Sequence, residues 1–206
     1  MNRGNALIDI ELLQRNKLMF QTVSATRSDG LRGGSPGANR GAAQETGMAR
    51  LKVAIVPVTP FEQNCSIVWD DDTKKAAIVD PGGDLPRIQG AIADLKVVPE
   101  KILLTHGHID HAGGAAELAE LLSIPIEGSH EDDAPLLANL TAQAQRFGLA
   151  GVRPVTPTRW LKEGDTVTVG GLTFDVLHVP GHAPGHVVFV HAPSEFALVG
   201  DTIFQG

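Results

Sequence analysis

The sequence lacks the residues and segments that mark secreted, membrane-spanning and nucleic-acid-binding proteins. It has one cysteine, Cys65, which excludes an internal disulfide framework and a cysteine-rich zinc site. No apolar run approaches the roughly 18 residues that a membrane span needs, and no apolar segment is followed by the small-residue cleavage site of a secretory signal. The net charge of −7 argues against a polyanion as a general partner. We therefore expect a cytoplasmic protein with no nucleic-acid or membrane partner.

The first 47 residues also lack the apolar periodicity of a folded domain. Residues 24–47 are rich in Gly, Ser, Ala and Arg, and residues 1–47 hold six basic against four acidic side chains. The rest of the chain holds 11 basic against 20 acidic side chains. Such a glycine-rich segment before an acidic domain predicts a disordered extension over 1–47 and a folded domain over 48–206.

Three interpretations of this extension follow from its residues. Met48 stands directly before the first regular strand, so we favour a translation start there and a gene-model extension upstream. A transit peptide is the alternative, but Asp9 and Glu11 do not suit one. Residues 8–20 could also form a short helix.

From residue 51 onward, the apolar spacing predicts strands interleaved with helices, followed by a β-rich half. Helical spacing is expected at 85–95, 111–122 and 132–147. Strands are expected at 51–58, 65–69, 76–79, 102–104, 124–126, 166–169, 172–179, 186–191 and 196–199. This order of elements predicts a layered α/β protein.

All eight histidines lie between His106 and His191, and this clustering is typical of metal ligation. His106, His108, Asp110 and His111 fall within six positions, after a predicted buried strand and before a predicted helix. In an extended segment alternate side chains share one side, so His106 and His108 can hold one ion together. Asp110 and His111 then face a neighbouring position. Imidazole and carboxylate groups suit Zn²⁺ or non-haem iron.

Two later turns supply further ligands. A predicted strand ends at Pro180-Gly181, which presents His182 as a third nitrogen beside His106 and His108. Another strand leads into Asp201, whose carboxylate can bridge two cations. A histidine-rich surface turn would not explain this repeated placement at strand ends.

The remaining histidines and Asp80 are assigned other roles. His186 and Asp80 are expected to support ligands rather than to bind metal. For Asp80, the alternative is a plain turn residue. We expect His178 to be packed within its strand, His130 to cap a helix or lie on the surface, and His191 to be exposed at a strand end.

At this point the sequence resembles a known family. The Thr-His-x-His-x-Asp-His-x-Gly-Gly run of residues 105–114, the His-Val-Pro-Gly-His-Ala-Pro-Gly-His run of residues 178–186 and the Gly200-Asp201 turn are similar to the metallo-β-lactamase superfamily. The resemblance covers residues 51–206 and is closest to short bacterial glyoxalase-II-like (hydroxyacylglutathione hydrolase-like) proteins. It implies an αββα sandwich with a metal centre between the sheets.

The resemblance also implies the roles of the ligands. It implies two divalent metal ions, with zinc favoured and iron or manganese compatible. The first ion would take His106, His108 and His182, the second Asp110 and His111, with Asp201 bridging. Asp110 is in addition the candidate catalytic residue. In such enzymes a metal-bound hydroxide attacks a carbonyl carbon, here of a small glutathione thioester such as S-lactoylglutathione.

The chain departs from the family pattern at its C-terminal side. The family takes a further histidine for the second metal from a later Gly-His turn, which this sequence does not contain after Asp201. We therefore expect a fold truncated at the C-terminus and an incomplete second metal site.

Other functions stay open at the level of sequence. A mononuclear-iron persulfide dioxygenase has the same fold and motif, and an inactive metal-binding fragment is the second alternative. A β-lactamase or lactonase is disfavoured because there is no secretory signal and no cysteine among the candidate ligands. A nuclease is disfavoured by the acidic domain.

Overall fold

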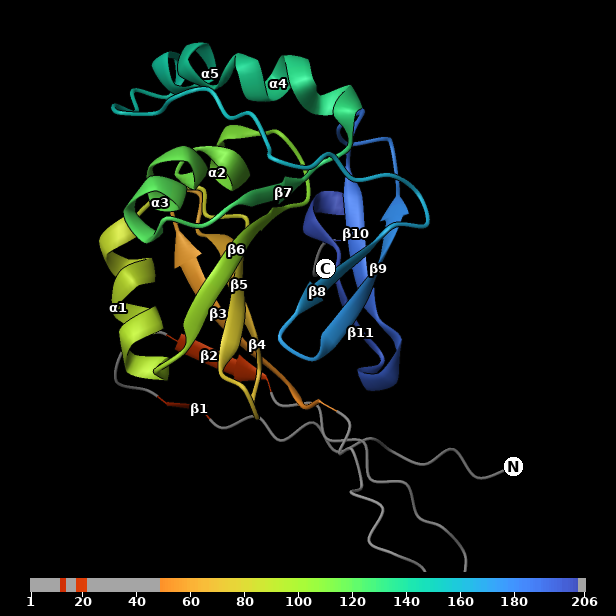
Figure 1. Ribbon diagram of the computed structural model, residues 1–206. Coiled ribbons are helices and arrows are strands. Elements are labelled where there is room, and N and C mark those ends of the chain that lie inside the picture. The colour runs from red at the N-terminus through yellow and green to blue at the C-terminus, as the bar shows by residue number, and fades with distance from the viewer. Residues whose placement is uncertain (1–11, 14–17, 22–48, 204–206) are drawn as a thin grey trace, which may run out of the picture.

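Two β-sheets lie face to face, and helices cover the outer face of the larger one (Figure 1). The computed structural model describes residues 12–13, 18–21 and 49–203. The larger sheet has seven strands in chain order. They are β1 (Leu12–Leu13), β2 (Leu18–Gln21), β3 (Leu51–Val58), β4 (Gln63–Asp70), β5 (Lys75–Val79), β6 (Val98–Leu104) and β7 (Ile126–Gly128). Neighbouring strands are antiparallel up to β5, and β5, β6 and β7 are parallel.

The second sheet has four antiparallel strands in the order β11-β10-β9-β8. They are β8 (Thr166–Val169), β9 (Leu172–His178), β10 (Val187–His191) and β11 (Phe196–Leu198). Burial alternates strictly along β8 and β9, as expected for strands with one face on the core. The expected strands 51–58 and 166–169 are confirmed to the residue, and the other expected strands are confirmed with ends shifted by a few residues.

The space between the sheets is filled by apolar side chains from both. Val68 and Leu103 of the larger sheet meet Phe174 and Phe189 of the smaller one, and all four are almost fully buried. Each such side chain contributes roughly 1.5–3 kcal/mol relative to exposure. This core fixes one sheet against the other, and therefore fixes the loops at their common edge.

Helices α1 (Leu85–Leu95), α2 (Ile109–Ala112) and α3 (Ala115–Leu122) cover the outer face of the larger sheet (Figure 1). Their buried side chains, Ile88 and Leu118 among them, form a second core with that sheet. Helices α4 (Ala134–Ala138) and α5 (Leu140–Arg146) cross the top of the molecule in Figure 1. Across the part of the chain that the structure describes, no helix is long and apolar enough to cross a membrane.

Two expected helices are broken in the structure, while the helix at 85–95 is confirmed. The helix expected at 111–122 is divided into α2 and α3 at Gly113 and Gly114, because these glycines lie against the 80–83 turn. A Cβ atom on Gly114 would lie 2.6 Å from the carbonyl oxygen of Pro81. The helix expected at 132–147 is a 3₁₀ turn (Glu131–Asp133) followed by α4 and α5, which meet at Asn139.

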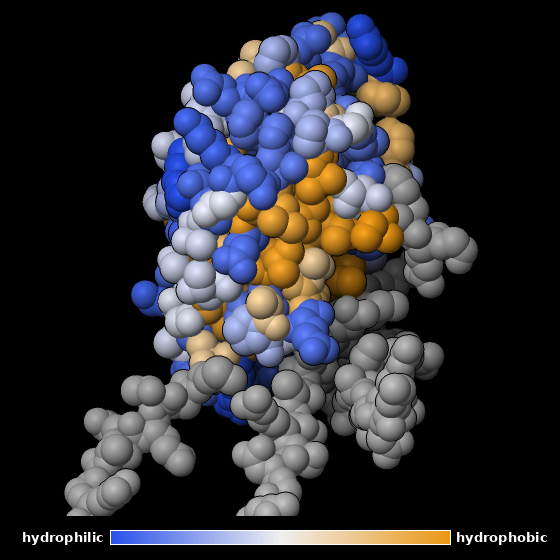
Figure 2. All heavy atoms as spheres, turned by 90° about the vertical axis from the view of Figure 1, so that its right-hand side faces the viewer, coloured by the Kyte–Doolittle hydropathy of each residue, from blue (hydrophilic) through white to orange (hydrophobic). Residues whose placement is uncertain are grey.

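The outer face of the four-stranded sheet bears no helix among the described residues, so three layers of the expected αββα sandwich are seen. Figure 2 shows hydrophobic surface gathered on this side of the molecule. Leu177, on the outward side of β9, is 40% exposed. The architecture is that of the α/β sandwich expected from the sequence.

The N-terminal extension is largely outside the described residues. The helix considered for 8–20 is wrong where it can be checked, because β2 pairs with β3 through Met19 opposite Ile55 and Phe20 opposite Ala54. Within the described residues, strand β1 pairs with β2 alone. The assignment of 1–47 as an extension of the domain stays a prediction.

We expect a chain that begins at Met48 to keep the melting temperature and metal content of the full chain. The reason is compositional, since residues 24–47 offer almost no apolar pattern for a core. Calorimetry and metal analysis of both chains test this. A clear fall in melting temperature would instead show that the pairing of β2 with β3 contributes to stability.

Candidate metal centre

Three loops meet at one edge of the two facing sheets, and they carry all six candidate ligands. The loop after β6 leads into α2 and holds His106, His108, Asp110 and His111. The loop between β9 and β10 holds His182, and the 3₁₀ turn (Gly200–Thr202) after β11 holds Asp201. The hydrogen bond from Val187 N to Thr105 O, 2.8 Å long, ties β10 to the end of β6. Residues far apart in the sequence are thus brought to one point.

The rings of His106, His108 and His182 converge. Their centroids are 4.6–4.9 Å apart and their planes cross at 82–89°. One nitrogen from each ring lies within 4.8 Å of the others. His108 Nδ1 and His182 Nε2 face each other at 2.9 Å. Three nearly perpendicular imidazoles around one point match the protein side of a tetrahedral metal site.

Asp201 lies between this group and His111. Its Oδ1 is 3.1 Å from His111 Nε2, and its Oδ2 is 3.4 Å from His182 Nε2. His106, His111 and Asp201 form a second group whose ligand atoms lie within 4.8 Å of one another. Asp110 Oδ2 is 3.7 Å from His111 Nε2. A carboxylate in this position can contact ions in both groups.

A buried nitrogen shows that these residues fit a metal. His106 Nε2 is inaccessible and has no hydrogen-bond partner among the described residues. A buried polar atom without a partner is costly, so such atoms in a folded protein call for a bound group. Burial also lowers the pKa of His106 and His108 below the usual range, with neighbouring histidines adding to the effect, so both rings are neutral and offer lone pairs.

His111 differs from the other histidines because two carboxylates hold it. Burial opposes its charged form, but hydrogen bonds to Asp201 and Asp80 raise the pKa of His111 to about 10. The contact with His111 in turn lowers the pKa of Asp201. In the metal-free protein a proton therefore occupies His111, and a cation at this position would replace that proton.

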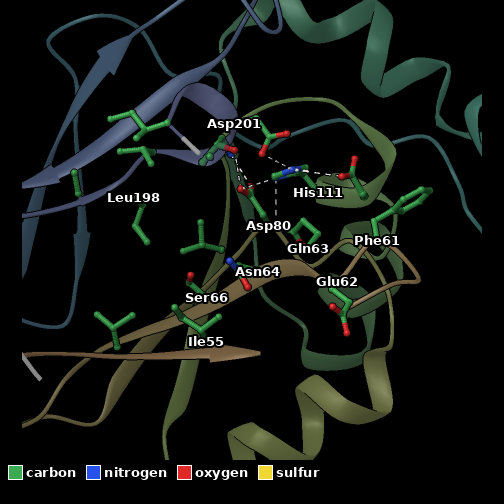
Figure 3. A pocket seen from close by; sticks show the side chains of 18 of the residues that line it. Ile55, Phe61, Glu62, Gln63, Asn64, Ser66, Asp80, His111, Leu198 and Asp201 are labelled. Carbon is green, nitrogen blue, oxygen red and sulfur yellow. Dashed lines mark hydrogen bonds and ion pairs between the residues drawn. The ribbon is translucent and has the colours of Figure 1, made fainter. Parts of the chain in front are cut away.

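Asp80 holds His111 from behind, as expected for a supporting residue. Its Oδ2 lies 3.0 Å from His111 Nδ1, and its two oxygens accept hydrogen bonds from Thr105 N and Thr105 Oγ1 at 2.8 and 2.6 Å. Figure 3 shows Asp80, His111 and Asp201 in one connected line of contacts, with Gln63 beside them. A carboxylate behind a ligand ring fixes the ring's orientation.

His186 also supports the centre, and this expectation is confirmed. Its Nε2 accepts a hydrogen bond of 3.1 Å from the backbone N–H of Asp201, and its ring stacks on His106 at 4.7 Å. Gly200 must lack a side chain here, since its φ is 50° and a Cβ atom would lie 2.6 Å from His186 Nε2. His186 therefore sets the position of Asp201 through the backbone.

The other histidines lie outside the centre. His130 caps the 3₁₀ turn by accepting a hydrogen bond from Asp132 N, and His178 packs on its ring, as expected. Although His130, Asp132 and His178 are close enough to share an ion, the two rings stack with planes only 13° apart, so their in-plane lone pairs do not converge. The expectation for His191 is wrong: although it is the last residue of β10, it shares the inward face of that strand with Phe189, so it is buried and lies against Phe174.

A cavity of about 580 Å³ opens beside the centre. Asp80, Asp110, His111 and Asp201 line one side of it, and Phe61 lies at its border (Figure 3). This volume is within the range of small-molecule sites. A substrate of modest size can therefore reach Asp110, His111 and Asp201 directly.

We expect Gly82→Ala to displace the helix that carries Asp110 and His111. A Cβ atom on Gly82 would overlap the carbonyl oxygen of Asp110, so one of the two backbones must move. The cost should be about 3 kcal/mol or more, together with weaker metal binding. Thermal unfolding and metal analysis measure both.

Gly90→Ala in α1 is the matched control, because nothing lies within 4 Å of the added Cβ atom. It should leave metal content unchanged and raise stability by up to about 1 kcal/mol. Equal behaviour of the two variants would contradict the proposed contact at Gly82.

Comparisons with known proteins agree on the class that this fold and site define. The family model described as the metallo-beta-lactamase superfamily matches residues 58–206. The chain belongs to the metallo-beta-lactamase superfamily. Among curated relatives, it is 45% identical over 157 residues to hydroxyacylglutathione hydrolase GloC of Haemophilus influenzae, covering 76% of this chain and 74% of that protein. Other relatives carry the same enzyme name, so the family is one of hydrolytic enzymes.

Solved structures support the fold. A protein crystallised in a di-iron-bound form, TTHA1623, is 35% identical with a TM-score of 0.66, covering 74% of this chain and 73% of that one. The B3 metallo-beta-lactamase BLEG-1 is 30% identical with a TM-score of 0.67 and the same coverage. The superfamily binds divalent metal ions, and the His and Asp groups of this chain suit such ions.

Proposed function

We propose that this protein is a metal-dependent hydrolase of glyoxalase II type that cleaves a glutathione thioester such as S-lactoylglutathione. The observation that carries the proposal is the convergence of His106, His108 and His182, with Asp201 between them and His111. The name of the relative at 45% identity supports the choice of substrate class.

The ligand roles follow the two groups of side chains. His106, His108 and His182 would hold one divalent ion, Asp110 and His111 would hold a second, and Asp201 would contact both. Zinc is the ion we favour, with iron or manganese compatible with the same donors. When bound, the ions supply an acidified water and polarise the substrate carbonyl.

The chain's own residues contribute orientation and proton transfer. Hydrolysis adds water to the thioester carbon, breaks the carbon–sulfur bond and releases a carboxylic acid and a thiol. Asp110 is the candidate catalytic residue, because its carboxylate borders the cavity and can accept the proton that the attacking water loses. Asp80 and His186 keep His111 and Asp201 in place from behind.

We place the activity in the cytoplasm and expect no nucleic-acid or membrane partner. The free thiol of Cys65 is buried and the acidic domain favours small-molecule substrates over polyanions. The partner of the site is then the thioester alone.

The experiment that tests the proposal compares two reactions on the metal-loaded protein. Loss of the thioester of S-lactoylglutathione is followed by absorbance, and oxygen uptake is followed with glutathione persulfide. We expect thioester cleavage without oxygen uptake. Oxygen uptake without cleavage would support a mononuclear-iron persulfide dioxygenase, and neither reaction in a metal-loaded protein would indicate an inactive metal-binding chain.

A further inference from the structure

We propose that Asp133 is a positioning residue that joins the two loops carrying the three-histidine group. The carboxylate is fully buried and lies in the 3₁₀ turn between β7 and α4. It belongs to none of the groups of described residues that could hold a metal ion. This inference rests on the proposed metal centre and adds a residue that controls its geometry.

Each oxygen of Asp133 binds a different loop. Oδ2 accepts a hydrogen bond of 2.9 Å from the backbone N–H of Gly107, which lies between His106 and His108. Oδ1 accepts a hydrogen bond of 2.6 Å from the backbone N–H of Gly185, in the loop of His182. One carboxylate therefore ties the first two ligands to the third.

The same turn holds the second loop through its backbone. His130 N donates to Gly185 O at 2.9 Å, and Asp133 N donates to His130 O at 3.0 Å. Ser129 Oγ adds a third hydrogen bond to the carboxylate, at 3.1 Å from Oδ2. The donors to this carboxylate among the described residues are neutral N–H and O–H groups. Hydrogen bonds from such groups to a carboxylate are charge-assisted and stronger than those between neutral groups.

Both glycines lie too close to the turn to carry a side chain. A Cβ atom on Gly185 would lie 2.6 Å from Asp133 N and from His130 O, and 2.8 Å from Asp133 Cγ. A Cβ atom on Gly107 would lie 2.9 Å from Leu136 Cβ, in the helix that follows the turn. Gly107 of His106-Gly107-His108 and Gly185 of Pro184-Gly185-His186 thus allow the same turn to approach the two loops.

Asp133→Asn separates this role from simple space filling. Asparagine has the same shape, but one of its two oxygen positions becomes an NH₂ group that can only donate. In either orientation the NH₂ group faces a backbone N–H, from Gly107 or from Gly185, so one loop is released. Metal affinity should fall by about 10–100-fold, the usual effect of losing a partner behind a metal site.

The test uses the full chain and measures metal affinity by competition with a chelator, together with the visible spectrum of the Co²⁺ form. We expect weaker binding, an altered Co²⁺ spectrum and a lower kcat at little-changed KM. Asp132→Asn is the matched control, because it removes one charge from the same turn but its carboxylate is exposed. Wild-type affinity and spectrum in folded Asp133→Asn, or equal losses in both variants, would overturn the proposal.

If Asp133→Asn does not fold, amide hydrogen exchange on the wild-type protein tests whether Asp133 holds the two loops. The N–H groups of Gly107 and Gly185 should be protected in the metal-free protein, because the carboxylate alone holds them. Fast exchange at both would overturn the proposal. Because affinity and exchange are measured without substrate, a failure to cleave thioesters would count against the proposed function alone.

Discussion

His182→Ala is expected to lose the metal of the three-histidine group and, with it, thioester hydrolysis. The ring supplies one of three converging nitrogens, and the remaining pair of His106 and His108 should hold an ion much less tightly. Loss of a residue that only hydrogen-bonds to a ligand weakens metal binding by about 10–100-fold. Removal of a ligand itself should therefore weaken metal binding by more than about 100-fold. Metal content per chain after dialysis measures the effect.

His182 is the informative position because its side chain is one-third exposed, at 34%, so its removal leaves the core intact. His106→Ala should lose the same metal, but His106 is fully buried and its loss also costs packing. His130→Asn is the control, because asparagine keeps a side-chain acceptor for Asp132 N and leaves the centre untouched. Full metal content in His182→Ala would contradict the assignment of the first group.

Asp201→Asn should lower turnover about as strongly as His182→Ala does. The substitution keeps the shape of the side chain but removes the charge between His111 and His182, and an amide nitrogen is no metal ligand. We expect fewer ions per chain and a loss of hydrolysis of more than about 100-fold. Metal analysis and steady-state kinetics measure the two effects separately.

Asp175→Asn is the control for this variant, since it removes one carboxylate charge from the exposed side of β9. It should keep wild-type metal content and turnover. Loss of activity in Asp201→Asn without any loss of metal would mean that Asp201 acts on the substrate rather than between two ions.

That the candidate ligands converge could be predicted from the sequence, because they follow local rules. The His-x-His spacing places His106 and His108 on one side of an extended segment, and each remaining ligand directly follows a strand or begins a helix. Strands β8 and β9 of the second sheet could also be predicted, because one face of each is buried and burial alternates along the chain. Such patterns depend on neighbouring residues alone.

The features that sequence reasoning missed depend on contacts between distant segments. Asp133 is one of three consecutive acidic residues, and such a run is typical of an ordinary helix start. Only the structure shows that its carboxylate binds the loops of Gly107 and Gly185. His191 was expected to be exposed, yet it lies on the inward face of β10 and packs against Phe174. The break between α2 and α3 follows from the close approach of the 80–83 turn, for which the glycine pair was the only signal.

The most direct test of the account is a titration of the metal-free protein with Zn²⁺ or Fe²⁺, in which bound metal and cleavage of S-lactoylglutathione are measured on the same samples. The account predicts no cleavage without metal and a rate that rises in proportion to the metal bound at His106, His108 and His182. Cleavage at an unchanged rate in the metal-free protein, or full metal loading with no cleavage of any thioester, would contradict it.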